Sequence, residues 1–74
     1  MTDAVTVDAR GTRCPMPIHL LSRAIDRTAE GTIVLLADDP NARVDVPVWC
    51  RLRHHELTEI SQTHGAWRFV LELG

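Results

Sequence analysis

The stretch TIVLLA, residues 32–37, is apolar on both faces and rich in branched side chains. Strands of this composition are covered on at least one face and have a neighbour on each side, so this segment is predicted to be a central strand. The DDPN sequence that follows, residues 38–41, is typical of a turn. The other elements are therefore expected to be arranged around residues 32–37.

Two elements are predicted before this strand. Residues 4–8, AVTVD, alternate with Val5 and Val7 on one face, which is typical of a short half-buried strand. From Pro15 onward, apolar residues recur at spacings of three and four, which predicts an amphipathic helix that stops before Gly31. The face expected to be buried carries Ile18, Leu21, Ala24, Ile25 and Ala29.

A second helix is predicted for residues 41–53, NARVDVPVWCRLR. Either Asn41 or Asp45 can cap it, and Pro47 fits a helix only where it lies in the first turn. The residues expected to face inward are Val48, Trp49 and Leu52.

The last third of the chain is predicted to form a hairpin. Residues 57–63 and 66–73 flank His64-Gly65, where glycine supplies the positive φ that a tight turn needs. Apolar and other side chains alternate along the second strand, so one of its faces belongs to the core. The core-facing residues are expected to be Trp67, Phe69, Leu71 and Leu73. Trp49 and Trp67 are expected to be core anchors.

The predicted order is strand, helix, strand, helix, strand, strand. This order is typical of an α/β (α+β) two-layer sandwich, a four-stranded mixed sheet with both helices on one face, because right-handed crossovers place the helices together. With 74 residues the chain is expected to be a single domain, residues 1–74, with no room for a large internal ligand cavity.

Composition and charge exclude some classes of function. Eight Lys and Arg against ten Asp and Glu give a net charge of -2, which provides no general attraction to nucleic acid or to anionic membranes. The amino terminus carries Asp3 and no apolar core typical of a secretory signal, and the longest apolar run, residues 33–37, is too short to span a bilayer. A cytoplasmic protein with two free thiols, Cys14 and Cys50, is expected.

The sequence RCPMP, residues 13–17, places a thiol at the predicted start of the first helix. A residue before proline is disfavoured in the helical conformation, so Cys14 is expected to be the last non-helical residue and Pro15 the first helical one. Pro17 then falls in the first turn, where its missing N–H has no intrahelical partner. The two prolines are expected to stiffen the turn and to fix the direction of the sulfur.

The helix start also predicts a reactive thiol. Its partial positive charge and free N–H groups favour thiolate over thiol, and Arg10 and Arg13 lie close in sequence and can add to this effect. The alternative is that Cys14 is a small buried residue at a strand-to-helix junction, as many cysteines are. The rigid Pro-x-Pro favours the reactive interpretation.

Several thiol reactions are disfavoured by the neighbouring residues. Dithiol exchange needs a second cysteine three positions on, where this chain has Pro17. Acyl transfer needs an oriented histidine, and His19 lies about 140° around the helix from position 14. The histidines at 54, 55 and 64 can approach only through tertiary folding. A thiolate that accepts a group and hands it on, as in persulfide transfer, needs no partner base.

The sequence also shows a resemblance to a known family. CPMP after DARGTR, together with ADDP at 37–40, DVPVWC at 45–50 and HEL at 55–57, resembles the TusA-like sulfur carriers, also called the SirA, YedF and YeeD group. One departure is His54, where the family often has glycine. The resemblance implies a two-layer α/β fold similar to the carboxy-terminal domain of translation initiation factor three.

The resemblance also implies a function. Cys14 is expected to carry sulfur as a persulfide between a cysteine desulfurase or rhodanese and an acceptor protein, without a cofactor. Destinations in the family include 2-thiouridine in tRNA, molybdenum cofactor formation and sulfur oxidation. Asp8 and Gly11 match the family pattern ahead of the motif and are expected to shape the loop under the sulfur.

The sequence also allows three other interpretations. Cys50 and His54 are four apart and would share a helix face, but with His55 they fall short of a four-ligand zinc site, so core packing of Cys50 and no metal are expected. A regulatory module that binds RNA or protein is the alternative function, and the acidity of the chain argues against direct nucleic-acid binding. Asp38 and Asp39 are expected to be solvated loop acids able to recognise a basic patch on a partner.

Overall fold

The sheet of this protein has four strands in the order β1-β2-β4-β3. In the computed structural model, which describes residues 4–28 and 30–73, the elements follow one another along the chain as β1 (Val5–Asp8), α1 (Met16–Thr28), β2 (Gly31–Ala37), α2 (Ala42–Leu52), β3 (Glu56–Thr63) and β4 (Ala66–Leu73). Strand β2 lies between parallel β1 and antiparallel β4. The predicted central strand and mixed sheet are therefore confirmed.

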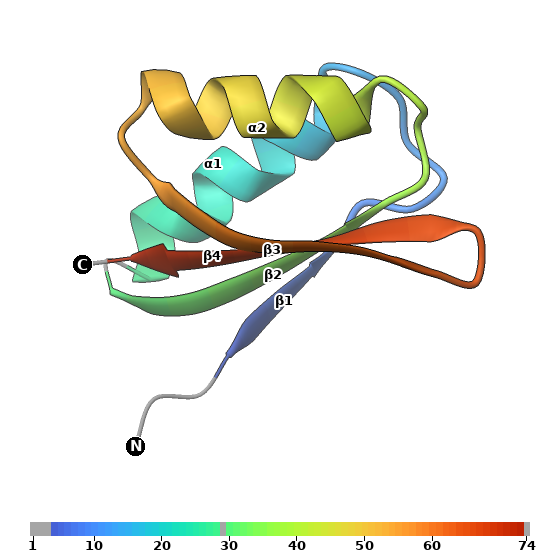
Figure 1. Cartoon of the computed structure of the whole chain (residues 1–74). Coiled ribbons are helices and arrows are strands. Elements are labelled where there is room, and N and C mark those ends of the chain that lie inside the picture. Colours follow the sequence, from blue (N-terminus) through green and yellow to red (C-terminus); the bar gives the residue numbers. More distant parts are fainter. Residues whose placement is uncertain (1–3, 29, 74) are drawn as a thin grey trace.

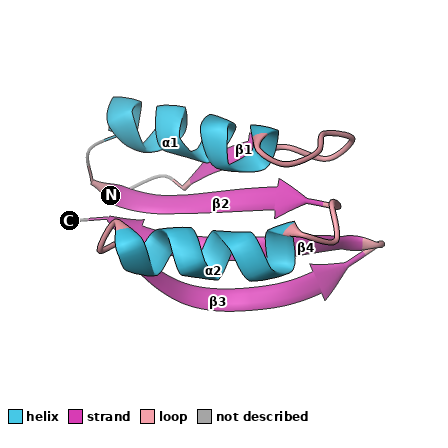
Figure 2. Cartoon of the chain, turned by 90° about the horizontal axis from the view of Figure 1, so that it is seen from above, coloured by secondary structure: helices cyan, strands magenta, loops and turns pink. Residues whose placement is uncertain are grey.

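Both helices lie on the same face of the sheet, as Figure 1 shows, and Figure 2 shows them running alongside each other above the strands. Each helix connects a strand to the next across this one face, which right-handed crossovers require. The predicted α/β (α+β) two-layer sandwich is confirmed. None of the helices among the described residues is long and apolar enough to cross a membrane.

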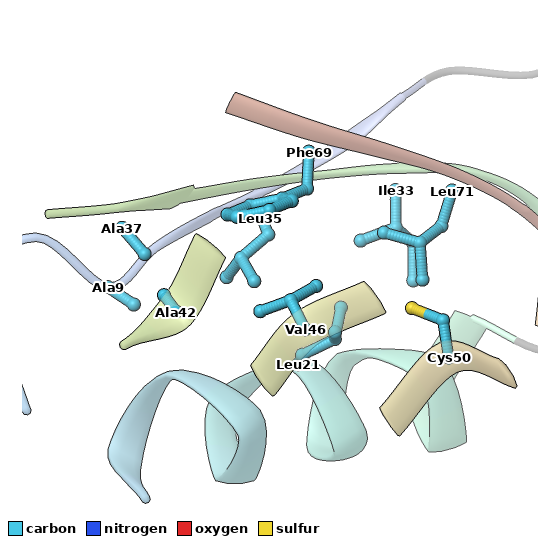
Figure 3. Packing of buried hydrophobic residues seen from close by; sticks show 10 residues of the cluster. All are labelled: Ala9, Leu21, Ile33, Leu35, Ala37, Ala42, Val46, Cys50, Phe69 and Leu71. Carbon is cyan, nitrogen blue, oxygen red and sulfur yellow. The ribbon is translucent and has the colours of Figure 1, made fainter. Parts of the chain in front are cut away.

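The core lies between the sheet and the two helices. Its buried cluster, shown in Figure 3, consists of Ala9, Leu21, Ile33, Leu35, Ala37, Ala42, Val46, Cys50, Phe69 and Leu71. Leu21 and the pair Phe69 and Leu71 confirm the predicted inner faces of α1 and β4. Trp49 and Trp67 are only partly buried and pack against the cluster from its margin. The predicted contact of Ala29 lies outside the described residues.

The inner face predicted for α2 is wrong for two residues. Val48 is 48% exposed and Leu52 is 72% exposed. The buried residues of α2 are Ala42, Val46 and Cys50, which are spaced four apart. Because each residue advances about 100° around the helix, positions two beyond Val46 and Cys50 lie on nearly the opposite side. Val48 and Leu52 therefore face away from the sheet.

The proline of α2 also departs from the prediction. Pro47 lies inside the helix, beyond its first turn, because α2 already begins at Ala42. Asn41 occupies the capping position without a side-chain cap bond. The hydrogen bonds at the start of α2 are made by Asp39 instead. Its backbone carbonyl accepts the Ala42 N–H at 2.9 Å, and its Oδ1 accepts the Asn41 N–H at 3.1 Å.

The start of α1 lies one residue later than predicted. Pro15 precedes the helix, and its carbonyl accepts the first helical hydrogen bond, from the His19 N–H at 3.0 Å. Pro17 lies in the first turn, as predicted. At the other end α1 stops at Thr28, and Gly31, with φ of 108°, is already the first residue of β2.

The predicted hairpin turn is confirmed. His64 and Gly65 connect β3 to β4 with φ values of 48° and 79°. Strand β3 starts one residue earlier than predicted, at Glu56, and its pairing with β4 is irregular between Leu57 and Glu59.

Candidate functional site

The candidate site lies where two loops meet. Because β1 and β2 are parallel, the loops that leave their carboxyl ends, β1–α1 and β2–α2, emerge at the same end of the sheet (Figure 1). Residues 11–14 of the first loop and 38–41 of the second line an open depression of about 740 Å³. Residues that are about 25 positions apart in sequence thus share one surface.

Cys14 is one of the residues that line this depression, and it is exposed. Its N–H donates a hydrogen bond to Asp39 Oδ2 at 2.7 Å, and its Sγ lies 3.4 Å from Asp45 Oδ2, within hydrogen-bond distance for a thiol donor. The peptide bond between Cys14 and Pro15 is cis. Cys14 is thus exposed at the surface, and its backbone N–H is hydrogen-bonded to Asp39 of the neighbouring loop.

Asp39 connects the two loops through hydrogen bonds of its carboxylate. Only 8% of this residue is exposed, and its two carboxylate oxygens accept the N–H groups of Cys14 and Asn41. These two bonds, first the one from Cys14, hold the pKa of the Asp39 carboxyl below its usual range. Asp39 is therefore not the solvated loop acid that was expected. Asp39 comes two residues after the end of β2 and two residues before Asn41, and an aspartate at such a position is a signal for a turn.

Asp38 and Gly11 form a second connection between the loops. The Gly11 N–H donates to Asp38 Oδ1 at 3.0 Å and to Asp38 Oδ2 at 3.2 Å. Gly11 has φ of 82°, and an added Cβ would meet no atom within 4 Å, so the backbone conformation rather than space requires glycine here. The expected role of Gly11 in shaping the loop is consistent with this geometry.

Asp8 and Arg10 form an ion pair at the start of the same loop. Asp8 accepts the Arg10 Nε at 2.9 Å, a terminal guanidinium nitrogen at 2.8 Å and the Arg10 backbone N–H at 3.1 Å. The side-chain bonds from Arg10 are the main reason why the pKa of Asp8 falls to about 2. The Arg10 guanidinium is thus held by Asp8, and the structure gives it no bond to the Cys14 sulfur. Arg13 lines the depression.

The electrostatics around Cys14 differ from the prediction. The pKa of the Cys14 thiol is raised, first by its hydrogen bond to Asp45, then by desolvation and by the negative charges of Asp45 and Asp39. The Asp45 carboxylate contacts the Cys14 thiol, and the Asp39 carboxylate contacts the Cys14 backbone N–H. At the helix start, Pro15 and Pro17 have no N–H groups that could stabilise a thiolate. The thiol form, not the thiolate, is favoured. Asp45, on α2, was missed as a neighbour of the sulfur.

Cys50 is separate from this site. It is 1% exposed, and Figure 3 shows its side chain pointing from α2 toward the sheet, in the direction of Leu71. Burial raises the pKa of the Cys50 thiol to about 11. Core packing of Cys50 is confirmed. His54 follows the end of α2 with φ of 61°, so it does not continue the helix face of Cys50, and within residues 4–28 and 30–73 no group of three or more His, Cys, Asp or Glu is placed to hold a metal ion.

Fold and site together define a small α/β protein that presents one exposed thiol at the junction of two loops, with its second thiol buried. Comparison with known proteins agrees with this class. The family model for the sulfurtransferase TusA matches residues 5–73. The chain belongs to the TusA family.

Individual relatives cover nearly the whole chain. A protein of Archaeoglobus fulgidus is 33% identical over 69 residues, which are 92% of this chain and 94% of the relative. The sulfur carrier protein TusA of Buchnera aphidicola is 34% identical over 71 residues, which are 95% of this chain and 90% of the relative. The crystal structure of a SirA-like protein from Desulfitobacterium hafniense has the same fold, with a TM-score of 0.82 at 21% identity over 95% of this chain and 97% of that one. Family membership supports a role as a sulfur carrier.

Proposed function

We propose that this protein carries sulfur as a persulfide on Cys14, in the cytoplasm, from a cysteine desulfurase or a rhodanese to an acceptor protein. The observation that supports the proposal most directly is the contrast between the two cysteines. Cys14 is exposed at the loop junction, whereas Cys50 is 1% exposed in the core. Only Cys14 can meet the sulfur of another protein without unfolding of this one.

The transfer step is a thiol–persulfide exchange. Cys14–SH and a donor R–S–SH give Cys14–S–SH and R–SH, so one S–S bond forms as another breaks and no external oxidant or reductant is consumed. The reaction needs an accessible sulfur held in a fixed position rather than an enclosed pocket. Asp39 provides this position through its 2.7 Å bond to the Cys14 N–H, and the open depression leaves the sulfur accessible. Acceptors in tRNA thiolation, molybdenum cofactor formation or sulfur oxidation fit the proposal equally.

The test uses both cysteines. The protein is incubated with a cysteine desulfurase and cysteine, and the intact mass is measured with and without a reducing agent. We expect the reducible addition of one sulfur atom to the wild type and to Cys50→Ala, and none to Cys14→Ser. Alanine is chosen at position 50 because it brings no hydroxyl into the core. Sulfur on Cys50, or on neither cysteine, would refute the proposal.

A further inference from the structure

The Cys14 sulfur has a hydrogen-bond partner from a distant part of the chain. Asp45 lies in the first turns of α2, 31 residues after Cys14, and its Oδ2 is 3.4 Å from the Cys14 Sγ. Asp45 is only half-buried, so its carboxylate can be reached from solvent. At this distance an ionised carboxylate accepts a hydrogen bond from the thiol and repels a thiolate.

We propose that Asp45 keeps the unloaded Cys14 in its protonated form, so that Cys14 becomes a nucleophile only when a donor protein places a cationic side chain against the Asp45 carboxylate. The proposal rests on the proposed function of Cys14 and assigns a further residue to it. Asp45 would thus act directly on the reacting sulfur, and its role would be to suppress the reaction of the free carrier.

The other charged groups around Cys14 do not offset Asp45. Asp39 accepts the Cys14 N–H with its Oδ2, and its negative charge also raises the pKa of the thiol. The guanidinium of Arg10 is paired with Asp8 at 2.8 Å. Asp38 accepts the N–H of Gly11 and belongs to the same acidic loop.

Among the residues that the structure describes, two sources of positive charge remain near the sulfur. They are Arg13, on the loop that carries Cys14, and the amino-terminal end of α1. The attraction of Arg13 acts on Asp39 and helps to hold the pKa of that carboxyl below its usual range. The pKa of the Cys14 thiol is nevertheless raised, first by the bond to Asp45. The carboxylates therefore outweigh the local positive charge.

The proposed step begins when the donor protein approaches Asp45. A Lys or Arg of the donor protein pairs with Asp45, and the hydrogen bond from the thiol is released. Sγ of Cys14 attacks the outer sulfur of the donor persulfide, a new S–S bond forms and the donor S–S bond breaks. The proton of Cys14 passes to the donor sulfur that leaves, which becomes a thiol. A donor with a basic group beside its persulfide is thus the class of partner that fits this site.

The test measures thiol reactivity without any sulfur donor. The rate of alkylation by iodoacetamide is followed as a function of pH for the wild type, Asp45→Asn, Asp45→Glu and Asp26→Asn, and the slow background from Cys50 is taken from Cys14→Ser. Asp26 is exposed on α1, about 15 Å along the helix from its start, so Asp26→Asn changes the net charge equally at a remote place.

We expect Asp45→Asn to react about threefold faster than the wild type at pH 7, the scale of one partly exposed charge contact. The midpoint of its rate profile should move to lower pH while the limiting rate at high pH does not rise, because a thiolate of lower pKa is not a stronger nucleophile. A merely loosened loop would raise the limiting rate instead. Asp45→Glu, which keeps the charge, and Asp26→Asn should both react like the wild type.

An Asp45→Asn rate equal to or below that of the wild type, with the fold intact by circular dichroism, would overturn the proposal. So would a faster rate for Asp45→Glu that matches Asp45→Asn. Because no donor is present, this result is independent of whether Cys14 accepts sulfur. Failure of the mass experiment would refute the persulfide role, and failure of the alkylation experiment would refute only the role of Asp45.

Discussion

Replacing Cys50 with serine is expected to destabilise the fold, although the two side chains differ by one atom. Cys50 is 1% exposed, and Figure 3 shows its side chain pointing from α2 into the core, toward the sheet. The serine hydroxyl would enter this apolar region. The acceptor within its reach along the helix is the backbone carbonyl of Val46, one turn earlier, and that carbonyl already accepts a hydrogen bond within the helix. A buried hydroxyl with poor pairing costs about 1–3 kcal/mol.

This cost is large for so small a protein. At roughly 0.05–0.15 kcal/mol per residue, a chain of 74 residues has a free energy of unfolding of about 4–11 kcal/mol. A loss of about 2 kcal/mol lowers the Tm of a domain of this size by about 8–16 °C. Cys14→Ser is the matched control, because the same atom is exchanged at an exposed position.

The assay is thermal and urea unfolding followed by tryptophan fluorescence, which reports on the partly buried Trp49 and Trp67. We expect a clear fall in Tm for Cys50→Ser and none for Cys14→Ser, with equal urea m-values. A Cys50→Ser variant within about 2 °C of Cys14→Ser would refute the argument that a hydroxyl is poorly accommodated at this place in the core.

Two further predictions concern Asp39 and the helix faces. The pKa of Asp39 in the folded protein is lowered by the N–H groups of Cys14 and Asn41. Its carboxylate therefore stabilises the fold at pH values above the unfolded pKa of about 3.9. This contribution is lost as the pH falls through the lower pKa of the folded state. Asp39→Asn should therefore lower the Tm at pH 7 and lower it less at pH 3; an equal deficit at both pH values would contradict this explanation. Leu21→Ala should cost about 2–5 kcal/mol in urea unfolding because Leu21 is fully buried, whereas Leu52→Ala should change stability by less than about 0.5 kcal/mol because Leu52 is 72% exposed. Comparable losses for the two leucines would show that α2 is rotated relative to the structure.

Much of the fold could be predicted from the order of residues along the chain. The apolar run at 32–37, the alternation along 66–73 and the three-and-four spacing after Pro15 each report burial directly, because a strand or an amphipathic helix repeats its buried side at a fixed period. The same holds for the turn at Gly65, where the backbone needs a positive φ. The prediction failed where the pattern was weak. In α2, the apolar residues Val44, Val48 and Leu52 follow the same spacing of four as Ala42, Val46 and Cys50, so the sequence offers two faces and only packing against the sheet selects one.

The candidate site, too, could be predicted from the sequence only in part. The residues next to Cys14 are enough to place it ahead of a helix start, after Arg13 and before two prolines, and the family resemblance is visible in the sequence alone. The surroundings of the sulfur depended on tertiary structure, because Asp39 and Asp45 are 25 and 31 residues away and meet Cys14 only when β1 and β2 pair in parallel and bring their following loops together. Local sequence therefore predicted an activated thiolate from the helix start and the arginines. The folded chain places the Asp45 carboxylate 3.4 Å from the Cys14 sulfur and the Asp39 carboxylate against the Cys14 N–H, and the negative charge of the two outweighs the partial positive charge of the helix start.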